Sequence, residues 1–237
     1  KFNFQKNFFS RVKKSLLKLK SKKINSIMIH DTKNYLKLNK ERKKFILNGL
    51  EKLKIQKIIK KYGFSIYTEK ELNELIKLKK FDIIQFPGNI FDQSILNNKN
   101  IYFLKKRGIE LHARSIFLQG LIFLKFDKTK KVTGVYSKKL KKFYDNFKTK
   151  EQKIFHCINF IKNHEFIDKV VIGITSFNEL KQIMTYLEKK LNKRNYSEFI
   201  IKNQKIYLSI QTIKINIFFI FQYIVYIFTN SYSCRQR

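Results

Sequence analysis

Polar side chains stand at or near the ends of four apolar runs in the sequence. His30 ends the first run, Ser65 the second and Gln85 the third, and Arg114 with Ser115 follows the fourth. In a parallel sheet covered by helices, strand ends and the helix N-termini after them offer unpaired donors, and small ligands bind there. An imidazole, hydroxyls, an amide and a guanidinium at that edge would hydrogen-bond such a ligand. The sequence therefore predicts a small-molecule site built from several strands.

Each of these groups also has a purely structural interpretation. A histidine at the end of an apolar strand is often satisfied within the core, and Gln85 with Asn89 can pair with backbone groups at a strand–turn junction. His112 lies two residues before Arg114, in a similar ligand-facing position. The residue types alone leave both interpretations open.

The elements that must position these residues alternate between strands and helices. Apolar runs predict buried strands at 24–29, at 58–65, at 81–86, directly after Gly108, and at 169–173. Apolar positions at helical spacing predict helices over 8–19, 41–54, 92–107, 137–163 and 176–190, with another helix beginning at Thr68. Strands that alternate with helices indicate an α/β fold with a parallel sheet covered by helices.

Short sequence signals mark several helix ends. Thr68 with Glu71, and Ser176 with Glu179, have the spacing of a capping box, in which two side chains satisfy free backbone N–H groups. Gly108 is expected to close the basic helix before it. Pro-Gly-Asn at 87–89 predicts a turn.

The chain is strongly basic, with 52 Lys and Arg against 17 Asp and Glu and a formal net charge of +35. Such a charge is typical of proteins that bind nucleic acid or an anionic surface, which is one alternative function. However, the lysines are spread along the chain, and Ile, Asn, Phe and Tyr, which also have A/T-rich codons, are abundant. The aromatic residues fall mainly at core spacing and not among clustered basic residues. We therefore attribute much of the charge to gene composition and expect no specific nucleic-acid partner.

The two cysteines, Cys157 and Cys234, form neither a disulfide framework nor a metal-binding pattern. Their scarcity favours a reducing, cytoplasmic setting, and we expect no metal site. No secretory signal peptide is recognisable at the N-terminus.

The strand–helix pattern stops near residue 192, so we expect a domain over 1–192 and an off-pattern aromatic and apolar tail over 193–237. Within the tail, Ile217–Phe228 is apolar but shorter than the roughly 18 residues that a transmembrane helix needs. We therefore expect no transmembrane span. An extra packed helix, an interfacial segment and sequence read past the natural end of the gene are the alternatives for this run.

Five segments, taken in order, resemble the aldo/keto reductase family. They are IMIHD at 27–31, YGFSIYTEKEL at 62–72, FDIIQFPGNIFDQ at 81–93, HARSIFLQGLI at 112–122 and KVVIGITSFNELKQI at 169–183. Each is a weak signal alone, but their common order and spacing are specific. The likeness is strongest to bacterial members that carry HARS-FLQG. It implies an incomplete (β/α)8 TIM barrel with strands four to eight present. It also implies hydride transfer, without a metal, between NADPH or NADH and a small carbonyl substrate, an aldehyde or a ketone.

The resemblance assigns roles to the polar strand ends. His30 matches the active-site histidine that orients and polarises the substrate carbonyl. Ser65 and Gln85 match the serine and glutamine that bind the nicotinamide carboxamide, although Ile66 replaces the usual asparagine. Arg114 stands where many members have a tyrosine that stacks on the nicotinamide ring, and a planar guanidinium can also stack.

The remaining matches concern the phosphates of the cofactor. Ser115 and the loop from Phe117 to Gly120 would approach the pyrophosphate, and Ser176 with Gln182 would lie in the adenosine-phosphate region. Members that prefer NADPH have an arginine where this chain has Glu179. A carboxylate repels the 2′-phosphate and so favours NADH, while the surrounding lysines oppose that effect.

The resemblance also identifies what the chain lacks. In the family, an aspartate, a proton-donating tyrosine and the lysine that lowers its pKa come from the first three strand units, which precede the first unit found here. General acid catalysis typically contributes about 10²–10⁴ in rate. We therefore expect a fragment that is poorly active alone. A non-catalytic remnant of a reductase gene is the other interpretation, and the substrate and oligomeric state stay open.

Overall fold

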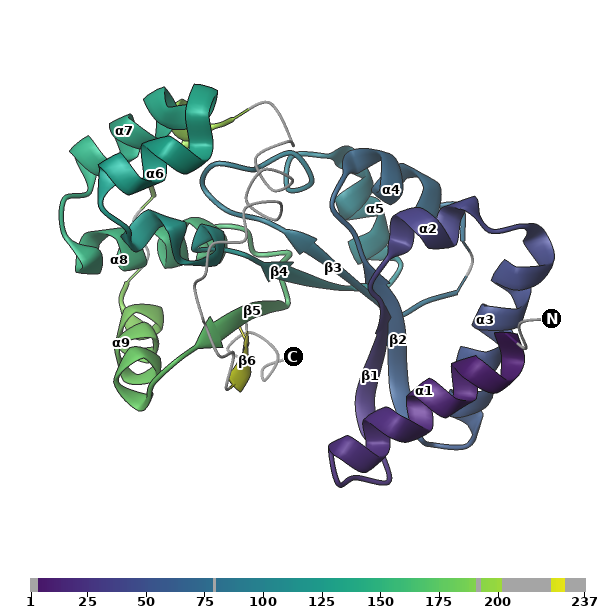
Figure 1. The fold of residues 1–237 in the computed structure, drawn as a ribbon. Coiled ribbons are helices and arrows are strands. Elements are labelled where there is room, and N and C mark those ends of the chain that lie inside the picture. The colour runs from purple at the N-terminus through teal and green to yellow at the C-terminus, as the bar shows by residue number, and fades with distance from the viewer. Residues whose placement is uncertain (1–3, 79, 191–192, 202–222, 229–237) are drawn as a thin grey trace, which may run out of the picture.

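The computed structural model describes residues 4–78, 80–190, 193–201 and 223–228. Its strands are β1 (Ile24–Ile29), β2 (Ile59–Ser65), β3 (Ile83–Pro87), β4 (Glu110–Arg114), β5 (Lys169–Ile174) and β6 (Tyr223–Phe228). They form one sheet in the order β1-β2-β3-β4-β5-β6, in which β1 to β5 are parallel and β6 is antiparallel to β5. The five parallel strands curl into a half-barrel (Figure 1). This confirms the predicted α/β fold and incomplete TIM barrel.

One helix precedes β1, and further helices follow each of the parallel strands along the chain. They are α1 (Phe4–Lys18), α2 (Thr32–Lys37), α3 (Lys40–Ile55), α4 (Glu69–Leu75), α5 (Lys99–Lys106), α6 (Phe126–Thr133), α7 (Ser137–Asn146), α8 (Lys150–Lys162) and α9 (Phe177–Glu188). Short 3-10 helices are η1 (Leu118–Phe123), η2 (Gly134–Tyr136) and η3 (Ser197–Phe199). In Figure 1, α1 to α3 lie beside β1 and β2, and α6 to α9 gather at the other end of the sheet, near β4 and β5.

The two faces of the sheet differ in polarity. Side chains alternate between faces along a strand, and Ile84 and Leu111 are completely buried in the hydrophobic core. On the opposite, inner face, the strand register places Gln85 beside Ser65 on one side and beside His112 on the other. The polar residues of neighbouring strands therefore share the concave face of the half-barrel.

Two aspartates tie neighbouring strand–helix units together in the same way. Asp82 Oδ2 accepts a hydrogen bond from the backbone N–H of Tyr62 at 2.9 Å, and Asp82 Oδ1 pairs with Lys54, in the last turn of α3, at 2.8 Å. Asp168 repeats this arrangement with the backbone N–H of Leu111 at 2.8 Å and with a lysine in the last turn of α5. Each aspartate thus joins the start of its own strand to the preceding strand and to the helix that leads into that preceding strand.

Most of the predicted elements are confirmed. Thr68 and Glu71 form the complete capping box at the start of α4. Gly108 has a positive φ of 77° just after α5, where glycine is favoured because it has no Cβ. Two helices were not predicted, namely α2 and α6.

The helix predicted over 92–107 is wrong in its first half, since α5 begins only at Lys99. Asp92 Oδ1 accepts hydrogen bonds from the backbone N–H and the hydroxyl of Ser94, at 3.1 and 2.6 Å. This local side-chain bonding holds a turn that competes with helix formation. Asn98 then caps α5 by accepting from the N–H of Asn100.

The single helix predicted over 137–163 is in fact two helices, α7 and α8. Thr149 Oγ1 accepts from the N–H of Gln152, and Gln152 Oε1 accepts from the N–H of Thr149, at 3.2 Å each. This capping box begins a new helix and so allows the chain to turn between the two. Phe147, at the turn, packs against Phe143 and Phe199.

The predicted tail, 193–237, is described only in part. Phe199 is fully buried in the core, and the N–H of Ile201 donates to the carbonyl oxygen of Phe91 at 2.8 Å. Residues 223–228 form strand β6 against β5 and not an extra helix, whereas 217–222 lie outside the described residues. The division of the chain at residue 192 stays a prediction. In the part of the chain that the structure describes, no helix is long and apolar enough to cross a membrane.

Candidate functional site

A cavity of about 1100 Å³ lies at the carboxyl ends of the strands of the half-barrel. Its walls include all the predicted site residues except Ser65, namely His30, Gln85, Arg114, Ser115, Phe117, Ser176 and Gln182. These residues lie in β3, at the end of β4, or in the segments that follow β1, β4 and β5, so segments far apart in the sequence meet at one place. The expected juxtaposition is present, while the role of each residue stays a prediction.

Ser65 lies next to this cavity and not in its wall. The residue is 1% exposed, and its register partner across the β2–β3 pair is Gln85, which does line the cavity. The backbone oxygen of Ser65 accepts from the hydroxyl of Thr32 at 2.8 Å. Its own hydroxyl is buried and has no hydrogen-bond partner among the described residues. A buried, unpartnered hydroxyl is costly unless something binds it, so Ser65 is a candidate ligand group.

His30 is exposed at the end of β1 and lines the cavity. Its ring lies edge-on to the ring of Tyr67, with 6.5 Å between the ring centroids. The adjacent Asp31 is occupied elsewhere, since its carboxylate accepts from the N–H of Asn34 at 3.0 Å and caps α2. The imidazole of His30 therefore faces the cavity without a carboxylate from its own neighbour.

Arg114 is held at the cavity wall by the segment that follows β2. Its Nη2 donates to the carbonyl oxygen of Ile66 at 3.2 Å, and its guanidinium carbon lies 4.2 Å from the centre of the Tyr67 ring. Nη1 lies 3.4 Å from the hydroxyl oxygen of Ser115. A guanidinium stacked on an aromatic ring gains a cation–π interaction, which fixes its plane.

The segment after β4 turns sharply beside Arg114. Ser115, Leu118 and Gln119 have positive φ values of 59°, 47° and 55°, and Gly120 has 85°. Asn89 Nδ2 donates to the carbonyl oxygen of Ser115 at 3.2 Å. Left-handed conformations are costly for residues with a Cβ and occur where the surrounding structure imposes them, often at ligand sites. The turn places Gln119 and Gly120 in the cavity wall.

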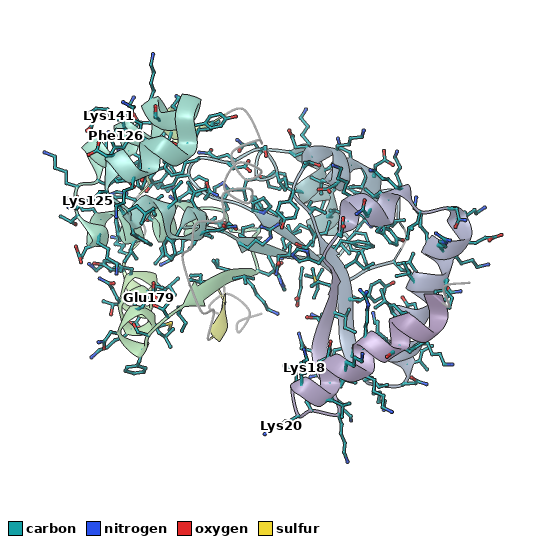
Figure 2. The ribbon with its side chains drawn as sticks, in the orientation of Figure 1. Lys18, Lys20, Lys125, Phe126, Lys141 and Glu179 are labelled. Atoms are coloured by element: carbon teal, nitrogen blue, oxygen red, sulfur yellow. The ribbon has the colours of Figure 1, made fainter. Side chains whose placement is uncertain are left out.

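The opposite wall comes from the start of α9. Ser176 Oγ accepts from the N–H of Glu179 at 3.2 Å, as predicted. The return bond of the predicted capping box is displaced by one residue, because the Glu179 carboxylate accepts from the N–H and the hydroxyl of Thr175, at 2.8 and 3.0 Å. Gln182 Nε2 lies 3.4 Å from a carboxylate oxygen of Glu151 on α8. Figure 2 shows the Glu179 side chain on α9.

Cations outnumber carboxylates in the cavity wall, which carries Arg114, Lys150 and Lys181 with Glu179. Neither lysine was predicted as a site residue. Lys150 is the first residue of α8, and its ammonium lies 5.7 Å from the ring centre of Phe123, another wall residue. Thr149 and Gln152 have the spacing of a capping box, and this sequence signal would have revealed the helix start at Lys150. An anionic ligand is favoured at such a wall because helix N-termini carry partial positive charge.

Basic side chains outside the cavity are dispersed. Lys18 and Lys20 lie at the end of α1, at the opposite end of the half-barrel from Lys125 and Lys141 near α6 and α7 (Figure 2). This agrees with the spread of lysine along the sequence. Binding of nucleic acid or an anionic surface stays an alternative prediction.

A charged cluster occupies the inner face below the cavity. Glu110 contacts Lys61 of β2, Lys169 of β5 at 3.2 Å and His112 Nε2 at 3.1 Å. Burial raises the pKa of Glu110, but its hydrogen bonds to these three partners outweigh burial and lower the pKa to about 2. Burial lowers the pKa of His112. His112 is 3% exposed and is not in the cavity wall, so the structure assigns it to this cluster.

The described residues include no group of three or more His, Cys, Asp or Glu side chains placed to hold a metal ion. Cys157 is fully buried on α8, and burial raises the pKa of its thiol. A protonated, buried thiol is unreactive.

A half-barrel of parallel strands with a polar cavity at their carboxyl ends defines an α/β protein of the barrel class, in which ligand sites lie at that edge. The profile of the aldo/keto reductase family matches residues 5–203. The chain therefore belongs to the aldo/keto reductase family, which confirms the resemblance of the five sequence segments.

Solved structures with a similar fold are also aldo-keto reductases. The chain matches the apo form of an enzyme from Bacillus halodurans with a TM-score of 0.61 and 16% identity, covering 88% of this chain and 68% of that one. The holo form gives 0.58 and 16%, with coverage of 86% and 65%. A thermostable aldo-keto reductase, Tm1743, in complex with the inhibitor epalrestat gives 0.57 and 16%, with coverage of 86% and 66%. At this identity the likeness shows the fold, and the chain spans about two thirds of each structure.

One curated protein, the DNA-directed RNA polymerase subunit beta of Carsonella ruddii (strain PV), is 28% identical over 186 residues. The match covers 68% of this chain and 14% of the polymerase subunit. Because the match covers so small a part of the polymerase subunit, at such low identity, it supports no inference about the function of this chain.

Proposed function

We propose that the cavity binds the nicotinamide dinucleotide NADPH or NADH, and that the chain is the cofactor-binding part of a reductase acting on an aldehyde or ketone. The observation that carries this proposal is the convergence of His30, Gln85, Arg114, Ser115 and residues of α9 on one cavity. Those residues come from separate motifs of the family to which the chain belongs.

The residues present fit such a cofactor. Ser65 has a buried hydroxyl without a partner, directly beside Gln85 in the register, and a carboxamide offers both a donor and an acceptor to these two groups. Arg114 presents a planar guanidinium at the wall, on which an aromatic ring can stack. The turn through Gln119 and the cations Lys150 and Lys181 suit a pyrophosphate and its neighbours.

A nicotinamide cofactor, when bound, supplies the hydride for carbonyl reduction. His30 is the cavity residue suited to hold the substrate carbonyl, because an imidazole N–H can donate to the oxygen that gains negative charge. Asp31 caps α2, so its carboxylate is already engaged by the backbone of that helix. The chain's own contribution is therefore to orient the cofactor and the carbonyl group.

We further propose that this chain alone is a poor reductase. In the family, the aspartate, tyrosine and lysine of the acid–base group come from the first three strand units, and β1 here corresponds to the fourth strand. Without a general acid, reduction would leave an alkoxide that is not neutralised, at a typical cost of about 10²–10⁴ in rate. Activity would return when those units are supplied.

A non-catalytic remnant is the second candidate. The observation that favours it is Ile66, which stands where the family's usual asparagine would help to bind the carboxamide. A remnant would retain the sequence motifs as a record of ancestry, without saturable cofactor binding.

Fluorescence titration with NADH and NADPH, beside a circular-dichroism melt, distinguishes the two candidates. We expect saturable binding and a cooperative melt for the wild-type chain. Gln85→Ala should abolish or strongly weaken binding, whereas Gln56→Ala, an exposed glutamine at the end of α3, should not. A cooperative melt without saturable binding of either nucleotide would reject the cofactor site and leave the remnant.

A further inference from the structure

Tyr67 lies behind the cavity wall and touches two of its residues. Its ring supports the guanidinium of Arg114 at 4.2 Å and meets the edge of the His30 ring at 6.5 Å between centroids. Both partners line the cavity, whereas Tyr67 does not. One side chain thus contacts the residue proposed to stack on the nicotinamide ring and the residue proposed to hold the carbonyl.

We propose that Tyr67 is a positioning residue that fixes the plane of Arg114 and its spacing from His30, and thereby prepares the nicotinamide end of the cavity. This inference rests on the proposed function. Tyr67 acts through Arg114 and His30 and does not touch the cofactor or substrate.

The backbone around Tyr67 is itself held in place. The N–H of Tyr67 donates to Glu71 Oε2 at 2.6 Å, and the same oxygen accepts from the N–H of Thr68 at 3.0 Å. Glu71 is 7% exposed, so this carboxylate is a well-shielded anchor. The capping box of α4 therefore also fixes the residue that stacks on Arg114.

Two successive residues restrain the guanidinium. Ile66 accepts a hydrogen bond from Nη2, and Tyr67 supplies the aromatic face. An unrestrained arginine side chain loses rotamer entropy when a ligand orders it. Because Tyr67 restrains Arg114 before the ligand arrives, part of that loss is removed from the binding step.

The test compares NADH with ADP-ribose, which has the adenosine and both phosphates but lacks the nicotinamide ring. NADH binding is followed by its fluorescence, and ADP-ribose by its displacement of NADH and by calorimetry. Tyr67→Leu should weaken NADH binding about three- to tenfold, the range of a cation–π contact, while ADP-ribose binding stays unchanged. Tyr67→Phe keeps the aromatic face and should behave as wild type.

Arg114→Lys, which keeps the positive charge of the cavity wall but removes the planar guanidinium, provides an independent variant in case Tyr67→Leu does not fold. It should show the same selective loss for NADH, and Tyr67→Leu in that background should add no further loss, since the pair acts as a unit. Tyr102→Leu, at a half-exposed tyrosine on α5 that packs on Phe166, is the matched control and should leave both ligands unaffected.

The outcomes separate the two proposals. If Tyr67→Leu weakens the binding of NADH and of ADP-ribose equally, Tyr67 has a purely structural role. If NADH binding is unchanged, Tyr67 has no role in binding. Either result overturns this inference and leaves the proposed cofactor site intact. If wild-type protein melts cooperatively but binds neither nucleotide, both the proposed function and this inference are rejected.

Discussion

Glu110 and His112 lie two residues apart on β4, and Nε2 of the buried imidazole is 3.1 Å from Oε2 of the carboxylate. The same carboxylate contacts Lys61 and Lys169, so one anion neutralises cations from two other strands of the half-barrel. The charged side chains of this cluster, on the inner face of the sheet, are therefore paired with one another.

This cluster predicts acid sensitivity. The folded-state pKa of Glu110, about 2, lies below its ordinary value of 4.5, so its stabilisation is fully present above pH 4.5 and disappears as pH falls toward 2. Glu110→Gln should lower the free energy of unfolding by about 2 kcal/mol at pH 7, because charged hydrogen bonds are lost. Urea denaturation of both proteins across this pH range measures the difference, which should shrink toward zero at the acid end. A difference that does not depend on pH would contradict this assignment.

The lowered pKa of His112 acts in the same direction. Its imidazole binds a proton more readily in the unfolded chain, so stability should already begin to decline as pH falls below 6.5.

Gly63 is predicted to be intolerant of any side chain. A Cβ there would lie 2.0 Å from the carbonyl oxygen of Ile83 on the neighbouring strand. Gly63→Ala should therefore force β2 and β3 apart and cost about 3 kcal/mol or more. Gly108→Ala is the control, since its Cβ meets no atom of the described residues within 4 Å, and only its positive φ should cost about 1–2 kcal/mol. Equal effects in thermal melts would contradict the close approach of the strands.

The capping box of α4 gives a local stability prediction. Thr68→Ala removes the acceptor for the N–H of Glu71 and should cost about 1 kcal/mol in the free energy of unfolding. Thr68→Ser retains the hydroxyl and should recover most of that loss. Denaturant titration of the two variants checks the prediction, and a loss as large in the serine variant would show that the methyl group, and not the cap, is responsible.

The choice between NADH and NADPH is predicted to depend on Glu179. Its carboxylate is held by Thr175 at the cavity wall and would repel a 2′-phosphate. Glu179→Gln keeps an acceptor for Thr175 but removes the charge, and should tighten NADPH binding by about fivefold with little effect on NADH. Glu188→Gln, at the exposed end of the same helix, is the control. Parallel changes for both nucleotides would argue against a 2′-phosphate contact.

The sequence predicted the parts of the fold that depend on local patterns. Continuous apolar runs gave the parallel strands, and Thr68 and Gly108 marked helix ends correctly, because caps are set by neighbouring residues. The 92–107 prediction failed because helical spacing of apolar residues does not reveal the Asp92–Ser94 bonds, which hold a turn instead.

The candidate site was predictable where family motifs cover it and not elsewhere. Gln85 and Arg114 lie in such motifs and reach the cavity as expected. Lys150 lies outside these motifs. It reaches the cavity wall because α8 begins at this residue, whereas one continuous helix was predicted over 137–163. The contact between Tyr67 and Arg114 joins residues from two strand units, and no pattern within either unit specifies it.

Hydrogen–deuterium exchange of the wild-type chain, with and without saturating NADH, tests whether this cavity binds the cofactor. If the cavity binds the cofactor, exchange should slow at the 115–120 turn and at 175–182, which both contribute to the cavity wall, and should not change in α3. Unchanged exchange at both cavity segments, or protection confined to regions outside the cavity, would contradict the assignment of this cavity to the cofactor.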